Sequence, residues 1–203
     1  MRGPGKDHDA IRQTIVDAAG VLVAAEGVDA LTFRRVATAA KVSPGRVQHY
    51  FGDRSALVHA SFENVQQRVR RRVAEALPGP ETTPYDVVTA VLQALVPRNE
   101  GELEEQRMMA AFEGLALTDS LLAEDLRVGH SALVDLLNDQ FGLLVEQFAR
   151  PDAPAGTFGA AGTLAPMALA LAEGLSGQVL SGRLDADTAS GLINTFLAGV
   201  RHG

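Results

Sequence analysis

Residues 31–57 have the sequence LTFRRVATAAKVSPGRVQHYFGDRSAL, which contains the patterns of two short helices separated by a very short turn. Thr32 suits an N-cap, because its side-chain oxygen can accept a hydrogen bond from a backbone N–H of the first turn. The residues that follow are apolar at helical spacing, which predicts a helix over residues 33–40. They are Phe33, Val36, Ala37 and Ala40.

The second helix pattern starts directly after Lys41 and Val42. Ser43 is a second N-cap, and Pro44 fits the first helical position, where a missing N–H costs nothing. An inward face is supplied by Val47, Tyr50 and Phe51, and Gly52 ends the helix. Two short capped helices joined by a tight turn predict a helix-turn-helix.

The sequence on either side of this motif also has helical periodicity. An apolar stripe predicts a helix over residues 8–26 that stops at Gly27, and Asp53 is suited to cap a helix reaching about residue 77. That helix would be ~37 Å long. Further helices are expected near residues 84–97, 101–117, 119–149, 160–181 and 186–200, of which the segment 119–149 can break in two. Because no alternating strand pattern occurs, we predict an all-α protein.

Composition limits the class of protein. The 203 residues are 46% hydrophobic and 21% charged, as in ordinary globular domains, and there is no cysteine. Disulfides, thiolate metal sites and cysteine nucleophiles are therefore excluded. No apolar run is long enough for a membrane span, and the N-terminal residues do not have the pattern of a secretory signal. We expect a soluble cytoplasmic protein that does not bind membranes.

Charge is distributed unevenly along the chain, whose net charge is −7. Residues 1–77 hold 12 Lys and Arg against 8 Asp and Glu, whereas residues 78–203 hold 6 against 17. A basic N-terminal part on an acidic protein indicates that this part meets an anion. Chance remains an alternative explanation, because the excess is small.

The polar residues of the motif fall where double-stranded DNA would need them. Arg46 and Gln48 project from the helix that would enter the major groove, where arginine pairs with guanine and glutamine with adenine. Backbone phosphates suit the hydroxyl, cationic and glycine positions at the helix starts. The candidate DNA-binding residues are Thr32, Arg34, Arg35, Lys41, Ser43, Pro44, Gly45, Arg46, Gln48, His49, Tyr50 and Arg54. A merely solvated helix face is the alternative for each residue taken singly.

The run VSPGRVQHYFGDRSAL at residues 42–57 resembles the TetR family of transcriptional repressors, which typically has V-S-x-G-x-L-Y-x-Y-F-x-x-K-x-x-L there. The resemblance is strong over about residues 10–58 and weaker beyond. Lys41 departs from the usual glycine, Arg46 from a small residue or threonine, and Gln48 from tyrosine. These departures make the family a poor guide to the operator sequence.

The resemblance implies an N-terminal three-helix DNA-binding domain, residues 1–53, and a larger helical ligand-binding and dimerisation domain, residues 54–203. It implies a homodimer on a palindromic operator, released by an unknown small-molecule effector. The expected dimer contacts are Leu164, Ala168, Leu171, Leu175, Leu192 and Phe196, with burial inside one subunit as the alternative. The expected ligand contacts are Met108, Met109, Phe112, Phe141, Phe148 and Met167, with plain core packing as the alternative.

Two other classes of protein compete with this interpretation. An enzyme is disfavoured, because the chain has no nucleophile elbow, HExxH, P-loop or GxGxxG motif, and we predict no catalytic residue, metal site or cofactor. A helical bundle that binds small molecules or lipids without reading DNA would have no need of Arg34, Arg35, Arg46 and Arg54 at one end. The sequence therefore favours a ligand-responsive DNA-binding repressor.

Overall fold

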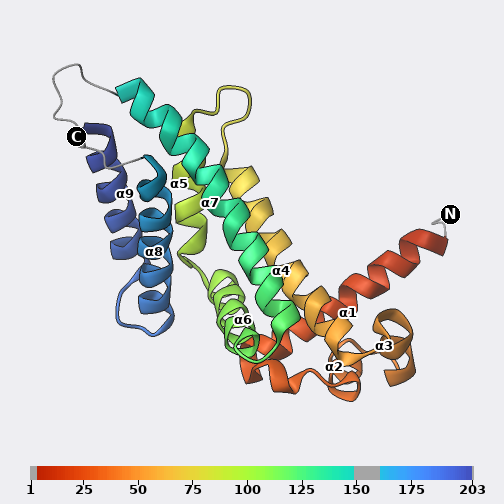
Figure 1. Ribbon diagram of the computed structural model, residues 1–203. Helices are drawn as coiled ribbons and strands as arrows, with labels where there is room; N and C mark the ends of the chain where they lie inside the picture. Colours follow the sequence, from red (N-terminus) through yellow and green to blue (C-terminus); the bar gives the residue numbers. More distant parts are fainter. Residues whose placement is uncertain (1–3, 149–160, 203) are drawn as a thin grey trace. The chain divides into compact units, whose positions relative to one another are not determined.

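The computed structural model describes residues 4–148 and 161–202, and every regular element in those ranges is helical (Figure 1). The all-α prediction is confirmed. The elements are α1 (Pro4–Glu26), the 3-10 helix η1 (Val28–Ala30), α2 (Phe33–Ala39), α3 (Pro44–Phe51), α4 (Arg54–Ala76), α5 (Pro84–Leu95), α6 (Glu100–Ala116), α7 (Ser120–Phe148), α8 (Ala161–Leu180) and α9 (Ala186–His202).

The predicted helices all occur, with ends shifted by a few residues. α7 is one continuous helix, so the possible break within residues 119–149 is not present. α1 begins at Pro4, four residues earlier than its apolar stripe indicated. The segment between α7 and α8, residues 149–160, lies outside the described residues.

The helices form two compact units. The first unit comprises Met1–Arg68 and Leu103–Glu124, and the second comprises Val69–Glu102 and Asp125–Gly203. α4 contributes residues to both. The predicted division at residue 53 into a DNA-binding and a regulatory domain concerns function, and it stays a prediction.

The core of the first unit joins α1 to the two short helices. α1 contributes a stripe at helical spacing, and α2 and α3 each contribute two buried side chains. The fully or nearly fully buried residues include Ile15, Ala19 and Val23 of α1, Val36 and Ala37 of α2, Val47 and Phe51 of α3, and Leu57 of α4. This packing is what leaves the other faces of α2 and α3 in solvent.

A polar cluster also connects α1 with α4 inside the first unit. The Gln13 Nε2 atom donates to Asn64 Oδ1 at 2.8 Å, and Asn64 Nδ2 donates to Asp17 Oδ1 at 3.2 Å. Arg68 pairs with the same Asp17 carboxylate. Asn64 is 7% exposed, so its hydrogen bonds replace the water that burial removes.

The turn between α2 and α3 has the geometry of a Schellman motif. Lys41 has φ 55°, and the Val42 N–H donates to the Ala37 carbonyl at 2.9 Å. Ser43 then starts α3, its hydroxyl accepting from the Arg46 N–H at 3.2 Å. Lys41 is thus left-handed although it has a side chain, at the position where the sequence departs from the usual glycine.

The core of the second unit is formed by α5, α7, α8 and α9. α5 packs against α8 and α9, which also pack against each other. Buried apolar residues from all four helices meet there, among them Val88 and Leu92, Leu137 and Phe141, Leu164, Ala168 and Leu169, and Ile193 and Leu197. The outward faces of α8 and α9 remain exposed (Figure 1).

We predict that Lys41→Gly raises the free energy of unfolding by up to about 1 kcal/mol, because glycine has no side chain to oppose a positive φ. Lys41→Ala is the matched control: it removes the same charge and keeps the β-carbon, so it gives no such gain. Urea denaturation of the three proteins measures the difference. A Lys41→Gly protein no more stable than Lys41→Ala would contradict the strain at this turn.

Candidate nucleic-acid interface

α3 separates its buried and exposed residues cleanly. Val47 and Phe51 face the core and are 0% and 7% exposed. Arg46, Gln48 and His49 lie on the opposite side in solvent, and Gly45 beside them leaves the backbone uncovered. An exposed polar face on a short helix braced from behind can lie in a groove of DNA.

The starts of α2 and α3 are capped as predicted. The Thr32 hydroxyl accepts a hydrogen bond from the Arg35 N–H at 3.3 Å, and Ser43 caps α3 in the same way. Thr32, Ser43 and Pro44 are exposed, so these starts are open to an approaching phosphate. Asp53 caps α4 through the Ala56 N–H at 2.8 Å.

Three of the candidate cations point into solvent without an internal partner. Among the described residues, Arg34, Lys41 and Arg46 make no ion pair or side-chain hydrogen bond, and all three are exposed. They come from α2, from the turn and from α3, so they surround the exposed face of α3. Unpaired cations around an exposed helix attract a polyanion.

The other two arginines of the motif hold the unit together. Arg54 donates from Nε to the Leu31 carbonyl at 3.0 Å and from a terminal nitrogen to the Val28 carbonyl at 2.9 Å. Arg35 pairs with Glu26 of α1, and the hydrogen bond between them lowers the pKa of Glu26 and raises that of Arg35. In this structure these guanidinium groups bind backbone or carboxylate oxygens of the chain, and their contact with DNA stays a prediction.

α1 contributes two contacts to α3 that the sequence did not reveal. The His8 ring lies 4.4 Å from the Tyr50 ring, between centroids, and the Arg12 guanidinium lies 5.4 Å from the Phe51 ring centroid. Tyr50, a predicted DNA contact, is half-buried and also faces His49 at 5.7 Å. Only the apolar residues of α1 stood out in the sequence, and nothing in the spacing of His8 or Arg12 indicated these partners.

Comparison with known proteins bears on the same segment. Residues 15–61 match the family model described as bacterial regulatory proteins, tetR family. The matched region runs from α1 to α4 and contains both helices of the motif. Residues 15–61 are therefore similar to the DNA-binding part of TetR-family regulators.

A bacterial regulator also matches part of the chain. The HTH-type transcriptional regulator PksA of Bacillus subtilis (strain 168) is 27% identical over 110 residues, which cover 54% of this chain and 53% of that protein. The match thus spans about half of that relative's length.

Solved structures share the whole fold. A candidate TetR-family regulator from Rhodococcus sp. has a TM-score of 0.80 at 22% identity, covering 95% of this chain and 99% of its own. A candidate transcriptional regulator from Saccharomonospora viridis, solved in complex with choline, has a TM-score of 0.79 at 18% identity, covering 94% and 96%. Within the described residues, no helix is long and apolar enough to cross a membrane.

The predicted ligand contacts do not lie around one cavity. Met108 and Phe112 are buried in the first unit, where Phe112 packs on Phe62 at 5.5 Å between ring centroids. Met109 is half-buried on the same helix, and Phe141 lies in the core of the second unit. Met167 is 58% exposed, and the Phe148 side chain is outside the described residues. The described buried residues among them fill cores, because flexible apolar side chains suit that role.

The predicted dimer contacts divide between core and surface. Leu164, Ala168 and Leu175 are buried within one chain, which was the alternative for each of them and corrects their assignment as contacts. Leu171 and Phe196 are half-buried against the same core, and Leu192 is 44% exposed. The apolar residues at helical spacing mark the face of α8 and α9 that packs inward, so they cannot also mark an outer interface.

We predict that Arg54→Ala lowers the free energy of unfolding by about 1–2 kcal/mol, because it leaves the Val28 and Leu31 carbonyls without a charged donor. Arg46→Ala should change stability by less than about 0.5 kcal/mol, since its exposed side chain makes no hydrogen bond or ion pair with the described residues. Urea denaturation of both variants gives the comparison. Equal stability of the two variants would contradict the separation of positioning from DNA-contacting arginines.

Proposed function

We propose that this protein is a TetR-family regulator and acts in the cytoplasm as a homodimeric repressor, which binds a palindromic operator and is released by a small-molecule effector. The observation that carries the DNA-reading part is the exposed face of α3, with Arg46 and Gln48 in solvent opposite the buried Val47 and Phe51. Arginine and glutamine are the side chains whose paired donors and acceptors match guanine and adenine in the major groove.

The remaining candidates have roles that follow from their positions. Thr32, Ser43, Pro44 and Gly45 stand at exposed helix starts, where backbone N–H groups can bind phosphate. Arg34 and Lys41 supply charge beside them, and His49 lies next to the reading residues. Arg35 and Arg54 act by keeping α1, α2 and α4 in register, and Tyr50 by bridging α3 to His8.

A selection of bound fragments from random duplex DNA at about physiological salt tests the DNA-reading role. We expect an inverted repeat with half-sites separated by about one helical turn or a multiple of it, because two equivalent heads must meet successive major grooves. A folded protein that enriches no sequence would overturn the proposal. An enriched site without internal symmetry would overturn the dimeric part alone.

Variants on the enriched site should separate base readers from phosphate contacts. Arg46→Ala should reduce discrimination at one base pair of each half-site by about 1–3 kcal/mol. Arg34→Ala should weaken binding to all sequences alike and reduce the slope of log affinity against log salt by about 0.9 for each head. Fluorescence anisotropy over a salt series measures both. A sequence-specific effect of Arg34→Ala would contradict its phosphate role.

The dimer is supported by the outer faces of α8 and α9. These faces carry small residues at helical spacing, which permit close approach of helices, and the exposed Met167 and Leu192. The small residues are Ala170, Gly174 and Gly177 of α8, and Thr188, Gly191, Thr195 and Gly199 of α9. Two such pairs would bury each other as a four-helix bundle.

A charge on this face should prevent dimerisation. We predict that Leu192→Lys is monomeric at micromolar concentration, because a partner would bury the ammonium group in an apolar contact. Leu143→Lys on α7 is the matched control, since Leu143 is 49% exposed against 44% for Leu192 and lies outside the proposed interface. Sedimentation velocity gives the masses. A dimeric Leu192→Lys protein would rule out this interface.

An effector role is supported by the choline bound to the Saccharomonospora viridis relative, which shows that this fold holds a small molecule. For release, the effector must bind the conformation that does not fit DNA more tightly than the one that does. We do not expect this chain to bind choline itself. Quaternary ammonium groups are bound by aromatic cages, and the cavity described below has no aromatic residue in its lining.

A further inference from the structure

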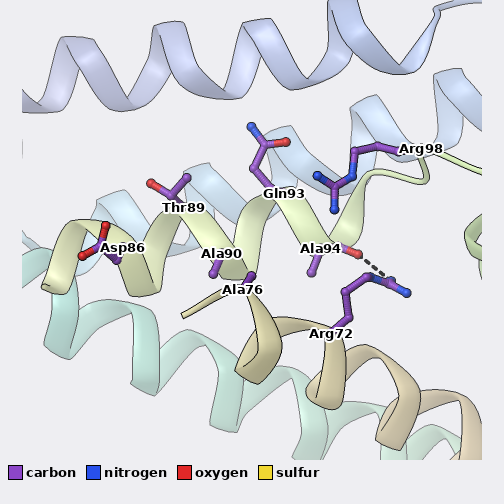
Figure 2. Close-up of a pocket in the computed structure, with 8 residues that line it drawn as sticks. All are labelled: Arg72, Ala76, Asp86, Thr89, Ala90, Gln93, Ala94 and Arg98. Carbon is purple, nitrogen blue, oxygen red and sulfur yellow. Dashed lines mark hydrogen bonds between the residues drawn. The ribbon is translucent and has the colours of Figure 1, made fainter. Parts of the chain in front are cut away.

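A cavity of about 250 Å³ lies between α4 and α5 within the second unit (Figure 2). α5 lines it with the face that includes Asp86, Ala90 and Ala94, and α4 contributes Arg72 and Ala76. The residues of α5 that pack into the core, such as Val88 and Leu92, are on a different face. The cavity is therefore separate from the apolar core and from every residue predicted as a ligand contact.

One end of the cavity is lined by two guanidinium groups. Arg72 and Arg98 approach the same carboxylate, with Nε atoms 3.9 and 3.8 Å from the two Glu102 oxygens. Glu102 also accepts from the Arg98 N–H at 2.8 Å and from Asn99 Nδ2 at 2.9 Å. The Arg98 side chain is 49% exposed, so a ligand can reach it from solvent. Arginine is well matched to a second carboxylate at such a position.

Between its charged ends the cavity is lined in part by alanine side chains. The side chains of Ala76, Ala90 and Ala94 line it, as Figure 2 shows, and no aromatic or long aliphatic side chain is among the lining residues. Methyl groups of this kind accept an unbranched aliphatic chain, whose transfer from water is favourable by about 0.8 kcal/mol per buried CH₂.

The residues that line the cavity also include two with a buried polar atom that makes no hydrogen bond. In the described structure, Thr89 Oγ1 and Gln93 Oε1 are sealed from solvent and take part in no hydrogen bond. The amide of Gln93 is held in place, since its Nε2 donates to the Ser190 carbonyl at 3.1 Å and to Asn194 Oδ1 at 3.0 Å. Buried polar atoms are normally paired, so these two atoms are exceptions in the lining of the cavity.

The far end of the cavity is negatively charged. Asp86 accepts from both the side chain and the backbone of Thr83, and these hydrogen bonds hold its pKa below the ordinary value. Asp86 and Ala94 are eight residues apart on α5, which corresponds to ~12 Å along the helix. A ligand anchored at Arg98 therefore meets an ionised carboxylate at its other end, where a second negative charge is disfavoured.

We propose that this cavity binds a small aliphatic carboxylate, held by Arg98 and Arg72 at its anionic end, whose far end is uncharged or cationic. The effector role of the bound molecule rests on the proposed function, whereas the binding itself does not. The cavity contacts α4, the helix that continues from the DNA-binding motif into the second unit.

Four probes with a common six-carbon chain test the assignment: hexanoate, 6-aminohexanoate, adipate and hexylamine. Titration into the ¹⁵N-labelled full chain without DNA should shift amide signals of residues 89–98 with hexanoate and 6-aminohexanoate. Adipate should bind at least several-fold more weakly, because its second carboxylate meets Asp86. Hexylamine should shift none of these signals.

Arg98→Gln should weaken hexanoate binding about tenfold or more, because it removes a charged hydrogen-bond donor. Arg71→Gln is the matched control: Arg71 is exposed on α4 next to Arg72 and is not among the lining residues, so its loss should leave the affinity unchanged. Asp86→Asn should restore adipate binding to the level of hexanoate.

Three results would overturn the inference: no carboxylate shifts residues 89–98, hexylamine binds as well as hexanoate, or Arg98→Gln has no more effect than Arg71→Gln. The proposed function is judged separately on operator DNA. If the protein binds no operator, its carboxylate binding can still be measured. If it binds its operator but no carboxylate, the repressor proposal stands and the carboxylate site is wrong.

Discussion

The turn between α2 and α3 is the constraint on which the DNA-binding unit depends. A Schellman hydrogen bond from Val42 to Ala37 closes α2, and Ser43 opens α3 one residue later. The chain therefore has no freedom in the angle between the two helices. Once Val47 and Phe51 are buried, that angle decides that Arg46, Gln48 and His49 face solvent. The left-handed Lys41 is a local cost that the closed turn requires.

The arginines of the motif have two different roles, and the sequence alone does not show which arginine has which role. Arg35 and Arg54 bind oxygens of the chain itself, and through them α1, η1, α2 and α4 are held together. The side chains of Arg34 and Arg46 make no hydrogen bond or ion pair with the described residues and are available to an anion. A rigid unit with uncommitted cations on one face is preorganised for DNA, because little side-chain and backbone order must be gained on binding.

In the second unit, the same helices serve core and surface with opposite faces. The large apolar side chains of α8 and α9 pack inward on α5 and α7, while small residues and two exposed apolar side chains face out. The cavity beside α5 is lined by a face of α5 that does not pack into the core. Its charges lie at the ends of α5 and its alanines between them, so selectivity there comes from charge at a distance more than from shape.

The sequence by itself determined the helical class, the caps at Thr32, Ser43 and Asp53 and the resemblance to the TetR family, because these depend on residues close together in the chain. It also placed α3, whose apolar and polar residues recur at helical spacing and so lie on different faces. Only the tertiary structure decided which arginines pair internally, which face of α8 and α9 is buried, and which polar residues line a common cavity. The reason is physical: periodicity shows that a helix has an apolar face, but the partner that covers this face lies far away in the sequence. Contacts such as Arg54 with Val28, or Arg72 with Glu102, exist only after helices distant along the chain have packed together.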